Sequence, residues 1–346
     1  MRTEYTPEFK EKFTATTYID LTRHGNRFGG PIKIKLENGQ VAEFEDTQEL
    51  TPEGIEASRG FGTTFPKEVA LVHPRGGDEK RHGQTGEHIM AGTGGKYGKK
   101  VVVTHEGEKI ITERDVAAPV LTKGDKVKGS RAGKGTDYKS SGMSKEFLGS
   151  IRNLINSELT RMVNSMPGSA QHQILNPENR ELRAKLREQA QVMGLKEAMK
   201  NEETTKLAAE NEAYELMHVV ELSRRGVKVG ETKAIPIVGS GMFAESLFKY
   251  ALVRKDKNTG VEKIGFDDID EIGGFTKQGT SLRIKLDRDT RIGDDRKLDD
   301  FTKDTFISYE FTDPERAAVL KNVGISLDWN KVMDLSRAAE QRFAKK

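Results

Sequence analysis

Two arginines flank a histidine in the short segment that spans residues 23 to 27, and a third arginine, Arg81, stands ahead of a later helical pattern. A transferring phosphoryl group carries negative charge on its equatorial oxygens, so a site for it needs fixed positive donors. Guanidinium groups supply paired hydrogen bonds and stay charged. A neutral imidazole can attack phosphorus when its other ring nitrogen is held protonated. We therefore predict phosphoryl transfer at His24, with Arg23, Arg27 and Arg81 holding the phosphate.

The composition narrows the chemistry further. The chain has no cysteine, which excludes disulfides, thiolate catalysis and cysteine-ligated zinc, and leaves histidine as the leading nucleophile. The other histidines show no metal-ligand spacing, so we predict neither a metal nor a cofactor; they include His73, His82, His88, His172 and His218.

The charge balance and hydropathy bear on partners and location. Lys plus Arg (57) nearly equal Asp plus Glu (54), so the net charge of +3 gives no general attraction to nucleic acid or to an anionic membrane. No run of about 18 apolar residues and no N-terminal apolar core of a signal peptide occurs. We expect a soluble, cytoplasmic protein whose partner is a small phosphorylated substrate or a phosphoprotein.

The elements that must position these residues alternate between strand and helix patterns. Residues 16–22 predict a strand that runs into the loop with His24, and residues 68–73 predict a second strand followed by a polar loop at 74–80. Thr51 as N-cap and Pro52 at the first helical position predict a helix to about residue 64, and another should start near Arg81. This rhythm predicts an α/β fold with a mostly parallel sheet, in which ligands bind beyond the carboxyl ends of the strands.

A charged helical stretch interrupts this pattern. We expect a core of residues 1–115 and 205–346 and a helical insertion at 116–204, which begins with a basic, glycine-rich mobile loop at 123–142. Helices are predicted at 144–166, 177–202 and 203–225. The insertion is either a lid or an outer helical layer.

The core resumes after the insertion. Short strands are expected at 101–104 and 110–115 before it, and after it a buried strand at 234–238, a tight turn at 239–241 and a helix at 242–253. Residues 281–286 alternate as in a strand with one face in water.

Three segments resemble motifs of a known family. Residues 21–27 resemble the signature loop of the histidine phosphatase superfamily, which includes phosphoglycerate mutases and acid phosphatases. Residues 50–55 resemble its Leu-Thr-x-x-Gly helix start, and residues 81–87 resemble its Arg-Ala-x-Gln-Thr-Ala-Glu segment. The resemblance implies a three-layer fold with helices on both faces of the sheet, a phosphohistidine at His24, and phosphate contacts from the three arginines. We add Asn26 to the predicted substrate-binding residues.

The family's general acid and second histidine are matched less directly. Glu113 resembles the position of the acid in the mutase-like branch, with Glu106, Glu108 and Asp115 as rivals. Ser240 stands where the family has its second histidine, and we place it among the substrate-binding residues. A serine cannot become a cation, so the transition state should be less stabilised. His105 is a less favoured substitute because it follows Arg81 too soon for the family's strand order.

These observations leave two functions open. The first is metal-independent hydrolysis of a phosphate monoester. The second is a catalytically weakened pseudo-phosphatase that binds a phosphorylated ligand or a protein. A mutase activity is a weaker third option, because nothing in the sequence shows how the phosphoenzyme would be kept from water.

Overall fold

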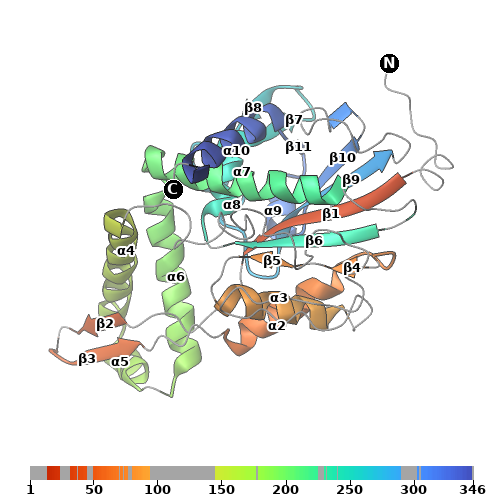
Figure 1. Ribbon diagram of the computed structural model, residues 1–346. Coiled ribbons are helices and arrows are strands. Elements are labelled where there is room, and N and C mark those ends of the chain that lie inside the picture. Colours follow the sequence, from red (N-terminus) through yellow and green to blue (C-terminus); the bar gives the residue numbers. More distant parts are fainter. Residues whose placement is uncertain are drawn as a thin grey trace.

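A mixed sheet of six strands forms the centre of the molecule (Figure 1). The computed structural model describes residues 14–23, 32–36, 38–44, 50–69, 71–72, 74–76, 80–93, 145–176, 178–224, 230, 232–239, 241–289, 302–303 and 305–344. The strands of the sheet, in spatial order, are β10 (Thr305–Phe311), β9 (Ser281–Asp289), β1 (Thr14–Arg23), β6 (Thr232–Gly239) and β4 (Leu71–Val72), and β5 (Arg75–Gly76) also pairs with β6.

The direction of the strands differs between the two halves of the sheet. Strands β1, β4 and β5 all run parallel to β6, whereas β9 runs antiparallel to both β1 and β10. The expected mostly parallel sheet is therefore a mixed one. The loop before β9 is fixed at the carboxyl end of β1, because the Thr22 hydroxyl donates a hydrogen bond of 2.7 Å to the carbonyl of Thr280. A strand that starts there must run back along β1.

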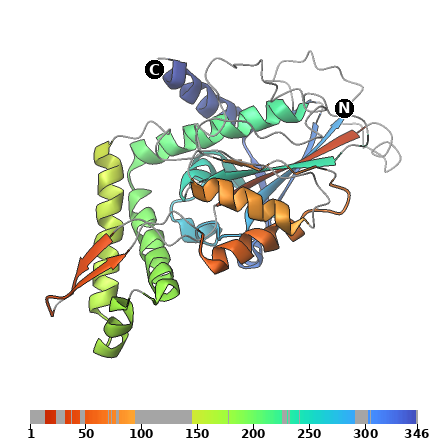
Figure 2. The ribbon, with the colours of Figure 1, turned by 60° about the horizontal axis from the view of Figure 1, so that its bottom comes forward.

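Helices cover both faces of the sheet (Figures 1 and 2). Successive side chains of a strand point to opposite faces. On one face, residues of β1 and β6 pack against α7 (Glu202–Arg224), α8 (Phe243–Ala251) and α10 (Trp329–Ala344). On the other face, Tyr18, Ala234 and Val238 pack against side chains that include Phe61 of α2 (Pro52–Thr63) and Ile89 of α3 (Lys80–Gly92).

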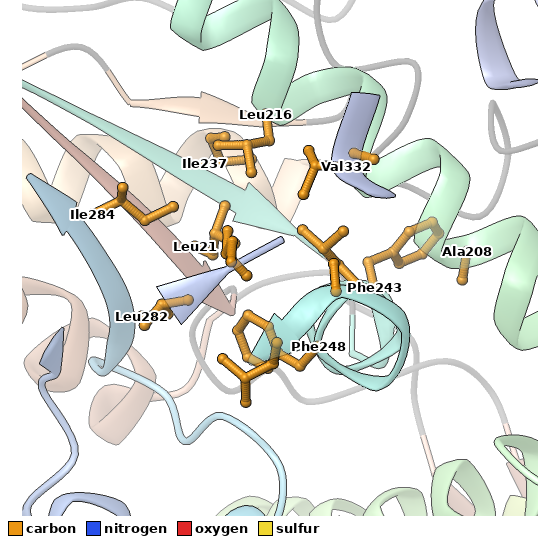
Figure 3. Close-up of a cluster of buried hydrophobic side chains, with 14 of the residues drawn as sticks. Leu21, Ala208, Leu216, Ile237, Phe243, Phe248, Leu282, Ile284 and Val332 are labelled. Atoms are coloured by element: carbon orange, nitrogen blue, oxygen red, sulfur yellow. The ribbon is translucent and has the colours of Figure 1, made fainter. Parts of the chain in front are cut away.

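The larger hydrophobic cluster fills the space between the sheet and the helices of the first face. Figure 3 shows side chains from the sheet meeting those of α7, α8 and α10. All of the labelled residues are fully buried: Leu21, Ile237, Leu282, Ile284, Ala208, Leu216, Phe243, Phe248 and Val332. Removal of this much apolar surface from water is the main stabilising contribution to such a layer.

In the layer on the other face of the sheet, α2 begins where the capping residues Thr51 and Pro52 predict. The Thr51 side chain accepts a hydrogen bond of 3.1 Å from the backbone N–H of Gly54, and Pro52 opens α2. This helix crosses α3 at two glycines. A Cβ atom on Gly62 would overlap the carbonyl oxygen of Ile89, and one on Gly92 would overlap that of Arg59. The close crossing of α2 and α3 therefore requires both glycines.

A second, smaller cluster lies in an arm beside the sheet. The arm contains α4 (Lys145–Asn164), α5 (Gly168–Leu175), α6 (Arg180–Ala198) and a hairpin of β2 (Ile32–Lys35) and β3 (Val41–Phe44) (Figure 1). The sequence patterns predicted neither α5 nor the hairpin. The apolar residues of the cluster come from all of these helices and from the hairpin: Ile34, Leu36, Ala42, Leu159, Val163, Ile174, Leu186 and Ala190. The C-terminal part of α6 leaves this cluster and enters the larger one through Leu195, Ala198 and Met199.

Several elements after β6 differ from the predictions. The helix expected at 242–253 ends at Ala251, because Leu252 already pairs with Leu327 in a small sheet. That sheet contains β7 (Leu252–Asp256), β8 (Glu262–Ile264) and β11 (Val323–Leu327). In the chain, η3 (Ile269–Ile272) precedes β9, and α9 (Pro314–Val319) follows β10. Residues 75–76 pair as β5 where a loop was expected.

Some predictions fall on residues that the structure does not describe. The expected strands at 101–104 and 110–115 and the basic loop at 123–142 lie outside the described residues. Across the helices that are described, none has the length and apolar content to cross a membrane.

A buried ion pair joins β1 to β9. Asp20 is fully buried, and its carboxylate accepts hydrogen bonds of 2.8 Å from Arg283 and 2.7 Å from the hydroxyl of Ser281. Arg283 also donates to the backbone and side-chain oxygens of Thr64 at the end of α2. Strand β9, which we expected to have one face in water, is thus buried on both faces.

We expect Arg283→Met to lower the free energy of unfolding by about 3 kcal/mol, because it leaves the Asp20 carboxyl buried without its cation. Urea denaturation at neutral pH measures this. Arg161→Met is the matched control, since the Arg161 side chain is 63% exposed and its pair with Glu158 lies on the surface of α4. It should change the free energy of unfolding by less than about 1 kcal/mol. Equal effects of the two substitutions would contradict a special role for the buried pair.

Candidate active site

The carboxyl ends of three parallel strands meet at one edge of the sheet. The register places Arg23, the last residue of β1, beside Gly239, the last residue of β6, and Gly76 of β5 beside Val238. Helix α3 starts shortly after Gly76, at Lys80. In α/β proteins such an edge is the usual position of a ligand site. The sequence continues from two of these strands into His24 and Ser240.

Arg23 is the predicted site residue whose side chain the structure describes. It is only 6% exposed, and its guanidinium donates to both carboxylate oxygens of Glu188 on α6, at 2.7 Å from Nη1 to Oε1 and 3.3 Å from Nη2 to Oε2. Glu188 is about one quarter exposed. Sequence reasoning missed Glu188, because charged residues occur all around α6 and no spacing distinguishes this one.

The third edge of the Arg23 guanidinium faces a glycine turn. Its Nε is buried and has no hydrogen-bond partner in the part of the chain that the structure describes. A Cβ atom on Gly241 would lie 3.4 Å from this Nε and 2.8 Å from a methyl carbon of Leu195 on α6. The turn continues into Met242, whose φ of 81° is unusual for a residue with a side chain. Backbone strain of this kind clusters at functional sites.

A buried carboxyl group lies on the other side of the same turn. Glu212 of α7 occupies the helical face between Ala208 and Leu216, both of which point into the core (Figure 3). Its Oε2 has no hydrogen-bond partner among the described groups and lies 3.8 Å from the position that a Cβ on Gly239 would take. In the sequence, Glu212 occupies an apolar stripe at i, i+4, i+8 spacing, with Ala208 and Leu216 on either side. This spacing could have indicated a buried carboxyl group, but Glu212 was not among the predicted site residues.

Burial changes the protonation of this carboxyl. Loss of water raises the pKa of Glu212 from its ordinary value of 4.5 to about 8, and the negative charges of Glu215 and Glu245 raise it further in the same direction. Glu212 is therefore mostly neutral at pH 7, a state in which a carboxyl can donate a hydrogen bond or a proton.

The other predicted site residues are placed only in part. Arg81 lies in the first turn of α3, five residues after the last residue of β5 in the sequence. Its side chain is not among those that the structure describes. Outside the described residues lie His24, Asn26, Arg27, Glu113 and Ser240, together with the alternatives His105, Glu106, Glu108 and Asp115. The convergence of three guanidinium groups on His24 therefore stays a prediction. Within the described ranges, no group of three or more His, Asp or Glu side chains is arranged to hold a metal ion.

Comparison with known proteins adds little to this geometry. No protein-family model matches the chain, and no curated protein matches it. Among solved structures it is similar to the apo form of Hafnia alvei phytase, with 12% identity over 95% of this chain and 96% of that one and a TM-score of 0.42.

Two other phytases show a similar likeness. The Klebsiella sp. ASR1 enzyme has 10% identity over 91% of this chain and 88% of its own, with a TM-score of 0.37. The Citrobacter braakii enzyme has 13% identity over 95% and 98%, with a TM-score of 0.37. Likenesses this weak do not establish a shared fold or activity.

We expect Glu212→Gln to weaken the dependence of stability on pH. From about pH 4.5 to pH 8, folded Glu212 holds a proton that the unfolded chain has released, so the free energy of unfolding falls as the pH rises through this window. Glutamine removes this loss, which amounts to roughly 1.4 kcal/mol for each unit of pKa shift and should be read as an upper limit.

Urea denaturation at about pH 5 and about pH 8 measures the difference between the variant and the unaltered protein. The variant should gain relative stability at the higher pH. Glu203→Gln is the control, because Glu203 is an exposed glutamate in the first turn of the same helix. A difference that stays constant with pH would mean that Glu212 is ionised in the folded protein.

Proposed function

We propose that the protein hydrolyses phosphate monoesters through a phosphohistidine at His24. The observation that best supports this is the buried Arg23 at the carboxyl edge of the parallel strands, with an N–H donor that no group of the described residues satisfies. A buried donor without a partner is costly, and a phosphate oxygen is a strong acceptor for it. The motif around His24 directly follows this arginine in the sequence.

The proposed reaction has two steps. In the first, a ring nitrogen of His24 attacks phosphorus, the bond from phosphorus to the ester oxygen breaks, and Glu113 gives its proton to the leaving oxygen. In the second, water attacks the phosphohistidine, the bond from phosphorus to nitrogen breaks, and the Glu113 carboxylate takes a proton from the water. Arg23, Arg27 and Arg81 offset the charge of the phosphoryl oxygens in both steps. The scheme uses no metal or cofactor.

The resemblance of three segments to the histidine phosphatase superfamily supports this assignment. The substrate that we propose is a small phosphorylated molecule or a phosphorylated protein side chain. Register supports the expected order of the site, because β1 and β6 end side by side. Strand β1 ends within the first family motif, and β6 ends one residue before Ser240, the position of the family's second histidine.

A pseudo-phosphatase that binds phosphorylated ligands is the second candidate. Strand β6 ends at Gly239, so the next residue, Ser240, stands where a cationic histidine would be expected. Serine supplies one hydrogen bond but no positive charge. The missing positive charge weakens stabilisation of the transition state more than it weakens binding of a phosphorylated ligand.

We expect His24→Ala to reduce hydrolysis of an aryl phosphate to the background rate, because the nucleophile is lost. Release of the phenol followed by absorbance measures this, and a panel of phosphorylated metabolites extends the assay to natural substrates. His172→Ala is the control, since His172 is an exposed histidine on α5. Turnover that survives His24→Ala would exclude the phosphohistidine mechanism, while phosphate binding without any turnover by the unaltered protein would favour the pseudo-phosphatase.

We expect Ser240→His to raise the rate of hydrolysis by about tenfold, because a cation beside the phosphoryl group stabilises the transition state by roughly 1 to 3 kcal/mol. Ser240→Ala is the control and should not raise the rate. The ratio of kcat/KM values for the variant and the unaltered enzyme measures the effect. An unchanged or lower rate in Ser240→His would show that position 240 does not contact the phosphoryl group.

A further inference from the structure

The Arg23 guanidinium is satisfied at one end only. A guanidinium has five N–H donors, one on Nε and two on each Nη. Glu188 accepts from Nη1 and Nη2, which form the end of the group, whereas the buried Nε has no partner among the residues that the structure describes. The edge formed by Nε and the nearer Nη is the other geometry in which arginine binds two oxygens of an oxyanion. This second edge is therefore available to a ligand.

The position of the second edge is fixed by the turn after β6. A Cβ atom on Gly241 would lie within van der Waals distance of Nε and Cζ of Arg23, at 3.4 and 3.7 Å. Since glycine has no such atom, the backbone of Gly241 lies close to this edge without a side chain of its own in the way. Leu195 borders the same position from α6. The free edge of Arg23 thus lies beside Gly241.

Helix α6 is packed against neighbouring elements on both sides of Glu188. Leu186 and Ala190 flank Glu188 and are buried in the cluster of the arm, and Leu195 farther along the helix is buried in the main core. Near its C-terminal end, Lys196 also pairs with Asp268 and Asp270, at 3.2 and 2.7 Å. A carboxylate on a helix that is packed at both ends can fix both the position and the plane of the guanidinium that it binds.

We propose that Glu188 is a positioning residue for phosphate binding. Its carboxylate holds Arg23 by the Nη1–Nη2 end, so that the Nε–H edge is presented to a phosphoryl group beside Gly241. The inference rests on the proposed function and extends it, because it makes α6 a support of the phosphate site instead of only a lid or an outer layer. The alternative, in which Glu188 competes with phosphate for Arg23, predicts a change of the opposite sign.

Inorganic phosphate is the probe that separates these possibilities. Under the proposal, Glu188→Gln weakens phosphate binding by about tenfold to 100-fold, because a misplaced guanidinium loses its paired contacts. Glu188→Asp, which keeps the charge on a shorter side chain, should restore part of the affinity. Glu181→Gln removes the same charge from an exposed position on α6 and should leave phosphate affinity unchanged. Isothermal titration calorimetry measures the dissociation constants, and thermal unfolding verifies that each variant is folded.

A second measurement uses the unaltered protein and does not depend on the folding of a variant. The NMR resonance of the Arg23 Nε–H, assigned by its loss in Arg23→Lys, should shift when phosphate is added. Tighter or equal phosphate binding by Glu188→Gln would overturn the proposal, and so would an unmoved Nε–H resonance at saturating phosphate. In those cases the test of turnover with His24→Ala would still decide the proposed function. Failure of the unaltered protein to bind phosphate at all would overturn both.

Discussion

The parallel pairing of β1 with β6 is the constraint on which the rest of the structure depends. Its register runs from Thr16 beside Thr232 to Arg23 beside Gly239. Because strand side chains alternate, Leu21 and Arg23 face the same layer of helices. Leu21 is part of the apolar core there, and Arg23 occupies the next position on that face at the end of the strand. One face of β1 therefore contributes Leu21 to the core and, at the next position on the same face, Arg23 to the candidate site.

Asp20, Arg23 and Glu212 are buried ionisable groups near β1 and β6. Two of them form ion pairs, and the third is kept neutral by a proton. The carboxylate of Asp20 is paired with Arg283, and the guanidinium of Arg23 is paired with Glu188. No cation of the described residues forms an ion pair with Glu212, and burial raises its pKa to about 8, so it is mostly neutral at pH 7. The difference follows from chemistry, since a carboxyl can take up a proton whereas an arginine in a protein cannot lose one. Because Arg23 keeps its positive charge when it is buried, it needs an anionic or hydrogen-bonding partner.

That requirement connects the arm to the sheet. Glu188 lies on α6 between Leu186 and Ala190, which pack into the smaller cluster of the arm. Its contact with Arg23 joins residues that are 165 positions apart in the chain. A helix that could have been a separate layer instead contributes a charged group at the carboxyl edge of the strands. The candidate site consequently includes a residue from the stretch in which the sequence motifs gave no sign of chemistry.

Several helices and strands could be predicted from the sequence because the interactions that form them are local. The β-branched run of β1, the Thr51 cap and Pro52 of α2, and the apolar run of β6 were all predicted, because propensity and capping act over a few residues. The sequence also predicts Arg23 as a site residue, and this role stays a prediction. Only the tertiary structure decided the antiparallel direction of β9, the placement of the β2–β3 hairpin in the arm, and the partner of Arg23. Those outcomes depend on which distant surfaces pack together, and a helix with charges on all sides carries no periodic signal for such a contact.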